Sequence, residues 1–119
     1  MRTLTIGLMD SASAMRDMRQ SAIRAWETGE YQGEALTFAT PAQLFKVFTL
    51  DRWDVIACLQ QQTKPIKLFE LSRLLGRNAQ SLQEDLDVLL AEGVVEQDEQ
   101  GISAPYTEIH TDFTLRKAA

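Results

Sequence analysis

The sequence predicts an α+β fold, because segments with helical spacing of apolar residues alternate with segments in which every second residue is apolar. From Leu50 to Tyr106 the expected order is helix, short helix, helix, and two strands closed by a tight turn. Two glycines divide this region: Gly76 stands between the second and third helices, and Gly93 ends the third. This order is that of a winged helix-turn-helix domain, expected here behind an N-terminal strand-helix-strand dimerisation segment.

Length and composition fit a small globular protein. The chain has 119 residues, of which 45% are hydrophobic, enough to form a core. No apolar run reaches the roughly 18 residues of a membrane helix, and the first ten residues lack the features of a secretory signal. Cys58 is the single cysteine, so no internal disulfide is expected. We therefore expect a cytoplasmic protein with no membrane partner.

Residues 1–48 are expected to form the dimerisation segment and a linker helix. The polar–apolar alternation from Thr3 to Leu8 predicts a half-buried strand. Apolar residues at helical spacing from Met15 to Trp26 predict a helix that Gly29 ends. A second short strand is predicted over residues 34–39.

Two threonines mark the starts of the next helices. Thr40 is followed by Pro41, which suits a first helical turn, and by Gln43, which completes a capping box. Thr49 is expected to cap the helix after it, which Pro65 cannot continue. The inner face of that helix is predicted to comprise Trp53, Ile56, Ala57, and Leu59 or Gln60.

Residues 49–106 are expected to form the winged helix-turn-helix domain. Asn78 is expected to cap its third helix, which is predicted over about residues 78–92. The apolar residues predicted for the second helix are Phe69, Leu71, Leu74 and Leu75. The core-facing residues predicted for the third helix are Leu82, Leu86, Leu89 and Leu90.

A hairpin and a last strand are expected beyond the third helix. Residues 98–101 (Asp-Glu-Gln-Gly) favour a turn, with Gly101 where a positive φ is expected. Residues 107–119 are expected to form a C-terminal strand and tail. The residues predicted on one face of that strand are Ile109, Phe113 and Leu115.

Charge is distributed unevenly along the chain, whose net charge is −5. From Leu50 to Gln80 there are five cations against three acids. From Ser81 to Asp112 there are nine acids and no Lys or Arg. The first stretch can face phosphate and the second would be repelled by it, so the overall charge alone does not exclude DNA as a partner.

The outer face of the third helix is expected to contact DNA, because polar side chains that hydrogen-bond can read base edges in a major groove. Arg77 suits a phosphate or a guanine edge, Gln80 and Gln83 suit adenine, and Ser81 suits either phosphate or base. The free N–H groups of the first turn are expected to add a phosphate site. The predicted DNA-binding residues are Lys67, Arg73, Arg77, Asn78, Gln80, Ser81, Gln83 and Glu84.

Three segments carry a resemblance to a known family: TLDRWDVIACLQQ, KLFELSRLLGRNAQSLQEDLDVLLAEGVVEQDEQG and PYTEIHTDFTL. From about Ile6 to Leu115 the chain resembles MarR-like winged-helix regulators, in particular a subgroup of small, antitoxin-like predicted regulators. The most specific elements are Leu74-Leu75-Gly76-Arg77, Asp85-Leu86 and Leu90-x-x-Gly93. The resemblance implies a homodimer that binds a double-stranded DNA operator and represses its own transcription, without catalysis or cofactor.

Two positions depart from the pattern of that subgroup. Glu84 stands near a position where a basic residue is usual, and the tip of the wing is Asp98-Glu99. Wings that enter a minor groove favour Arg or Lys. We therefore expect the wing to be a structural hairpin or to face a basic protein.

The main alternative is a protein-interaction module. In this interpretation, the acidic surface from Glu84 to Asp112 neutralises a basic partner such as a small toxin by charge complementarity. A small-molecule sensor would need an apolar pocket, which a sequence cannot show. No enzyme is expected, since the chain has no Gly-rich phosphate loop, and His110 has no second His or Cys at metal-ligand spacing.

A homodimer is also expected from the apolar residues of the terminal segments. The N-terminal strands and the strand ending at Leu115 are expected to pair open sheet edges across the interface. Two third helices would then lie roughly 34–36 Å apart, as a palindromic operator requires.

Overall fold

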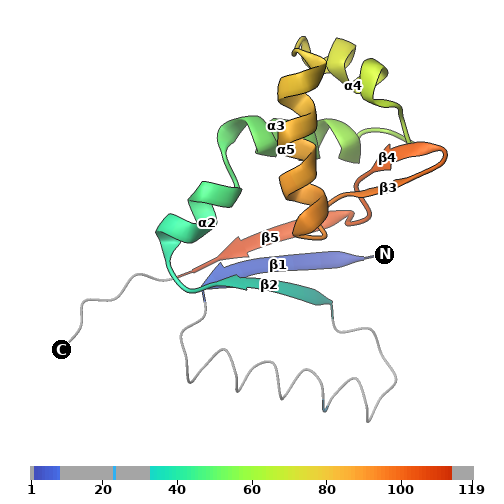
Figure 1. The fold of residues 1–119 in the computed structure, drawn as a ribbon. Helices are drawn as coiled ribbons and strands as arrows, with labels where there is room; N and C mark the ends of the chain where they lie inside the picture. The colour runs from blue at the N-terminus through green and yellow to red at the C-terminus, as the bar shows by residue number, and fades with distance from the viewer. Residues whose placement is uncertain (1, 9–22, 24–32, 114–119) are drawn as a thin grey trace. The chain divides into compact units, whose positions relative to one another are not determined.

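The computed structural model describes residues 2–8, 23 and 33–113, and the fold is α+β, as the sequence predicts (Figure 1). The chain divides into two compact units, one formed by residues 1–44 with 108–119 and the other by residues 45–107. The helix predicted from Met15 to Trp26, its end at Gly29, and Leu115 lie outside the described residues.

The first unit contains a three-stranded parallel sheet. Its strands are β1 (Thr3–Leu8), β2 (Glu34–Phe38) and β5 (Glu108–Asp112), in the order β2-β1-β5. All three strands are confirmed, and the alternation in β1 has the predicted effect, since Leu4 and Ile6 are buried. The pairing of β5 with β1 joins segments about a hundred residues apart in sequence, which the spacing of apolar residues does not specify.

Helix α2 (Pro41–Val47) begins with the predicted cap. The Gln43 backbone N–H donates to Thr40 Oγ1 at 3.2 Å. In return, Gln43 Oε1 accepts from the backbone N–H of Ala39 at 3.2 Å, one residue earlier than in the usual capping box. Two backbone donors around this helix start, those of Gln43 and Ala39, are therefore bonded to side chains, which fixes where the helix begins.

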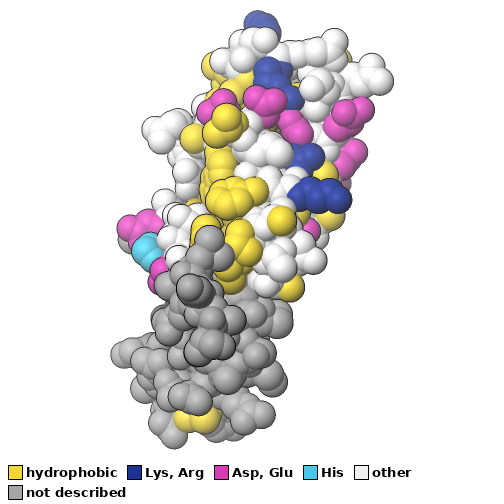
Figure 2. Space-filling model, turned by 90° about the vertical axis from the view of Figure 1, so that its left-hand side faces the viewer, with side chains coloured by type: hydrophobic (Ala, Val, Ile, Leu, Met, Phe, Trp, Pro, Cys, Tyr) yellow, Lys and Arg dark blue, Asp and Glu magenta, His cyan; other side chains and the backbone are white. Residues whose placement is uncertain are grey.

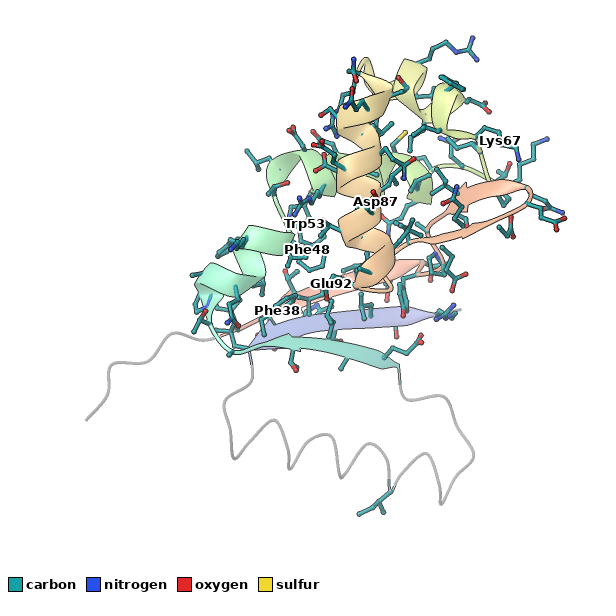
Figure 3. All side chains as sticks on the ribbon, viewed as in Figure 1. Phe38, Phe48, Trp53, Lys67, Asp87 and Glu92 are labelled. Atoms are coloured by element: carbon teal, nitrogen blue, oxygen red, sulfur yellow. The ribbon has the colours of Figure 1, made fainter. Side chains whose placement is uncertain are left out.

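Helix α3 (Leu50–Gln60) is capped by Thr49, whose Oγ1 accepts from the Arg52 backbone N–H at 3.3 Å. The predicted inner face is partly wrong. The buried residues of α3 are Val55, Ile56 and Leu59, whereas Ala57 is exposed. Trp53 is half-buried and stacks on Phe48 with 4.9 Å between ring centroids (Figure 3). Packing of that aromatic pair and of Val55 orients the helix. The spacing of apolar residues alone did not predict this orientation.

Helix α4 (Leu68–Leu75) is the short helix that the sequence predicts, and most of its apolar residues are not fully buried. Of its eight described residues, Leu71 alone is buried. Phe69 is 76% exposed and Leu74 is 55% exposed. A helix of two turns has room for one inward position on the side that meets α3 and α5, and Phe69 and Leu74 lie on the other side.

Helix α5 (Ala79–Ala91) has the predicted inner face: Leu82, Leu86 and Leu89 are buried, and Leu90 is partly buried. In Figure 1 it crosses α3 within the second unit. The two predicted glycines end α4 and α5 in the same way, with φ of 63° at Gly76 and 77° at Gly93. After Gly76, the backbone N–H of Arg77 returns to the Ser72 carbonyl at 3.1 Å, which satisfies an orphan carbonyl and turns the chain into α5.

The predicted hairpin consists of β3 (Glu96–Asp98) and β4 (Gly101–Ser103). Its turn is held by Asp98 Oδ1, which accepts from the Gln100 and Gly101 backbone N–H groups at 2.8 and 3.2 Å. Ile66 adds a third extended segment, exchanging backbone hydrogen bonds with Ile102 at 3.0 and 2.7 Å. A Cβ on Gly101 would lie 2.5 Å from the Ile66 carbonyl oxygen, so only glycine fits there.

Candidate nucleic-acid interface

The outer face of α5 is polar, as the leucine spacing predicts. Gln80, Ser81, Glu84 and Asp87 are exposed, and Gln83 is partly exposed. Gln83 Nε2 donates to Asp87 Oδ1 at 2.8 Å along this face. Because the three buried leucines lie on the opposite side, the polar face is supported by packed side chains. This arrangement can present hydrogen-bonding groups to a ligand without moving the backbone.

Arg77, one of the predicted DNA contacts, forms its side-chain hydrogen bonds within the protein. Its Nη2 donates to Asp85 Oδ2 at 2.7 Å and to Ser81 Oγ at 3.0 Å. The side chains of Arg77 and Asp85 are only 19% and 15% exposed, so water screens this ion pair weakly.

Asp85 also binds a second arginine. Its Oδ1 accepts from Arg52 Nε at 3.0 Å, and Arg52 Nη1 donates to the carbonyls of Lys46 and Val47 at 3.1 and 2.8 Å. These carbonyls belong to the last residues of α2, where a positive charge is favourable. The Arg52–Asp85–Arg77 cluster thus connects the end of α2, the start of α3 and the start of α5.

Sequence reasoning missed this cluster, because it treated Asp85 as part of a solvated acidic surface. One signal was present: Arg77, Ser81 and Asp85 are spaced by four residues, which places them on one side of a helix. No comparable signal identifies Arg52, which lies 33 residues before Asp85 and reaches it through space.

Asn78 is the N-cap of α5, as predicted. Its Oδ1 accepts from the backbone N–H groups of Gln80 and Ser81 at 2.8 and 3.3 Å. Two of the first-turn N–H groups expected to receive phosphate are therefore already bonded to a side chain. Fewer free N–H groups therefore remain at the N-terminus of α5 to bind an anion than the sequence suggested.

The two remaining predicted cations lie away from α5. Arg73 is exposed on α4, and Lys67 precedes α4 beside the hairpin (Figure 3). Lys67 Nζ donates to the carbonyl of Glu99 in the hairpin turn. Lys67 therefore holds the hairpin in place, and Arg73 remains an exposed basic side chain close to the turn between α4 and α5.

Lys and Arg do not form one basic patch on the face shown in Figure 2. There, their side chains alternate with Asp and Glu over the described part of the chain. At the hairpin turn Glu99 and Gln100 are exposed. On this face, a polyanion would therefore meet acids as well as cations.

Other chemistry has little support in the described residues. They contain no group of three or more His, Cys, Asp or Glu that could hold a metal ion. Burial raises the pKa of the Cys58 thiol, a change opposite to that of an activated nucleophile. None of the described helices is both long and apolar enough to cross a membrane.

Together the geometry defines an α+β protein in which a capped, leucine-backed helix presents a polar face beside a short hairpin. A family match covers residues 47–111, more than half of the chain, and the chain belongs to the HVO_A0114 family. The matched stretch runs from the last residue of α2 into β5 and includes all three members of the Arg52–Asp85–Arg77 cluster. No curated protein and no solved structure matched the chain.

Proposed function

We propose that this protein is a winged helix-turn-helix transcriptional regulator that reads DNA with α5. The exposed polar face of α5, between an N-cap at Asn78 and a glycine end, is the observation that carries the proposal. A helix entering a major groove needs polar side chains along its first turns and an opposite face that packs against the core. The buried leucines of α5 provide that packing.

The winged form of the domain is supported by the order of the elements. Helices α3, α4 and α5 are followed by the hairpin, and Ile66 adds a strand-like segment to it just before α4. The left-handed Gly76 makes the turn between the two helices that a helix-turn-helix requires. Family resemblance to MarR-like regulators points the same way.

We separate the residues that would contact DNA from those that hold α5 in position. We assign base contacts to Gln80 and Gln83, and a base or phosphate contact to Ser81. Arg73 is assigned to phosphate, since it is exposed on α4. Arg77 is assigned to positioning, because Asp85 and Ser81 already hold its guanidinium.

The scarcity of free cations predicts a shallow salt dependence. Each neutralised phosphate contributes about −0.9 to the slope of log K against log salt. Between α3 and α5, Arg73 and Lys64 are exposed cations that bond to no other described residue, whereas Lys67 bonds to Glu99, so we expect a slope of roughly −2 per protomer. A homodimer on a palindromic operator, repressing its own transcription, is the assembly that the family resemblance implies, and its slope would be doubled.

The test is a fluorescence anisotropy titration of the protein with its own upstream DNA and with scrambled DNA, repeated across salt. The double variant Gln80→Ala/Gln83→Ala should lower affinity for the upstream DNA at least about tenfold, since a good base contact is worth about 1–3 kcal/mol. Affinity for scrambled DNA should change little. Gln61→Ala, at an exposed glutamine beyond α3, is the matched control.

Two results would refute the proposal: no salt-sensitive complex with upstream DNA, or equal losses on both DNAs for the double variant. The contacts of Arg77 also exclude one otherwise obvious variant. Arg77→Ala would break the pair with Asp85, so any loss of DNA binding could reflect a displaced α5.

A second candidate is the neutralisation of a basic partner, such as a small toxin, by the acidic surface. It is favoured by exposed acids on α5 and at the hairpin, among them Glu84, Asp87 and Glu99. Charge reversal at Asp87 and Glu99 should weaken such a partner while leaving the folded state intact. Asp98 is unsuitable for this test, because its carboxylate holds the hairpin turn.

A further inference from the structure

The outer face of α4 combines apolar and charged side chains in an unusual way. The exposed residues of this helix are Phe69, Glu70, Arg73 and Leu74. They lie on one side, because positions three to four apart share a helix face. The opposite side carries Leu71 into the core. Helix α4 is therefore apolar on both sides, which a helix that only covers its own core does not need.

The two charges on this face are not used inside the described part of the chain. Glu70 and Arg73 are one turn apart on α4, yet no ion pair or side-chain hydrogen bond joins them or links either to another described residue. By contrast, Arg52 and Arg77 in the same unit each form an ion pair with Asp85. The outer face of α4 thus carries one acid and one base that remain open to an outside partner.

We propose that this face binds the same face of a second copy of the chain. In an antiparallel pair of α4 helices, a two-fold axis level with the midpoint between Leu71 and Ser72 makes Glu70 of each copy level with Arg73 of the other. The same axis makes Phe69 of each copy level with Leu74 of the other. Opposite charges then meet twice and the apolar side chains cover both ends, so charge complementarity selects a second copy as the partner.

The contact is small, and its size sets its strength. Eight helical residues span about 12 Å, so the pair buries less than the roughly 1,200 Å² of a standard interface. The contact is therefore weak in dilute solution and becomes significant at high protein concentration or in a larger assembly. It depends on α4 alone, and because Arg73 is also assigned to phosphate, it forms between copies whose Arg73 is not engaged by DNA.

The experiment measures self-association of the full chain by sedimentation over a concentration series without DNA. Glu70→Arg and Arg73→Glu should each weaken association about tenfold, because a two-fold contact loses both ion pairs and gains repulsion. The double exchange Glu70→Arg/Arg73→Glu should restore it. An equimolar mixture of the two single variants should also restore it, since their altered faces complement each other.

Apolar variants provide an independent measurement on the same face. Leu74→Gln should weaken association, whereas Leu50→Gln, at a leucine that is 84% exposed on α3, should not. All positions are exposed, so thermal unfolding should show each variant folded. If another surface already makes a tight dimer, the expected changes appear in the association of those dimers.

The proposal is overturned if the chain shows no association that responds to α4 substitutions. It is equally overturned if neither the double exchange nor the mixture restores what the single variants lose. In either case the face does not bind a second copy of the chain. Because no DNA is present, these outcomes are separate from failure of the proposed function.

Discussion

Helices α4 and α5 follow one another and end in the same glycine geometry, but they are seated in the unit very differently. Helix α5 buries three leucines, and its polar face is exposed to solvent. Helix α4 buries Leu71 alone and exposes Phe69 and Leu74. The contrast is one of exposed chemistry: α5 can present hydrogen bonds from a fixed position, whereas the outer face of α4 leaves two large apolar side chains uncovered.

The two helices also start differently. Asn78 caps α5 with two hydrogen bonds, while Lys67 at the start of α4 makes no capping bond with its side chain. In addition, Arg77 and Asp85 link the first turns of α5 to α3 through Arg52. Thus α5 is held at its start and along its length, and α4 mainly through Leu71 and its neighbours.

The largest expected effect tests whether α5 carries more of the core than α4. Leu86→Ala should lower the free energy of unfolding by about 2–5 kcal/mol, because it leaves a cavity at a buried site. Leu74→Ala should stay within about 0.5 kcal/mol, as expected for an exposed side chain. Urea denaturation of both variants measures the difference in the free energy of unfolding. Similar losses would show that α4 contributes as much to the core as α5.

An intermediate effect is expected at the Arg52–Asp85–Arg77 cluster. Asp85→Ala leaves two mostly buried guanidinium groups without their acceptor and should cost about 1.5–3 kcal/mol. Asp87→Ala, on the exposed side of the same helix, should change stability by about 0.5 kcal/mol or less. Equal effects in denaturant titration would mean that the cluster does not hold α5.

The smallest effect separates capping from recognition at Asn78. Asn78→Ala should destabilise the protein by about 1 kcal/mol through loss of the N-cap, and Asn78→Ser should restore most of that loss. If Asn78 acts as a cap, the serine variant also keeps affinity for upstream DNA. A stable Asn78→Ser variant with lost affinity would instead assign Asn78 a direct contact.

Local features of the fold were predictable because their causes are local. Thr40, Thr49 and Asn78 each accept hydrogen bonds from N–H groups within three residues, so a short motif identifies the cap. Gly76 and Gly93 end helices through a backbone conformation that other residues rarely adopt. The inner face of α5 followed from leucine spacing between Leu82 and Leu90, over about two turns.

The candidate site was predictable only in part. The exposed positions Gln80, Ser81 and Glu84 followed once the leucines were assigned to the core. The position of Arg77 did not, since its partner Asp85 looked like one acid among many on a helix surface. The exposure of Phe69 was also missed. The spacing of apolar residues in a short helix does not show which of them face the core and which face the solvent.

The sequence alone specified where α2, α3 and α5 begin, where α4 and α5 end, and which side of α5 is apolar, since caps, glycines and periodicity act over a few residues. Only the tertiary structure decided that β5 pairs with β1, that Ile66 joins Ile102, and that Asp85 bridges two arginines. These contacts join residues far apart along the chain, so their partners depend on which surfaces meet in space.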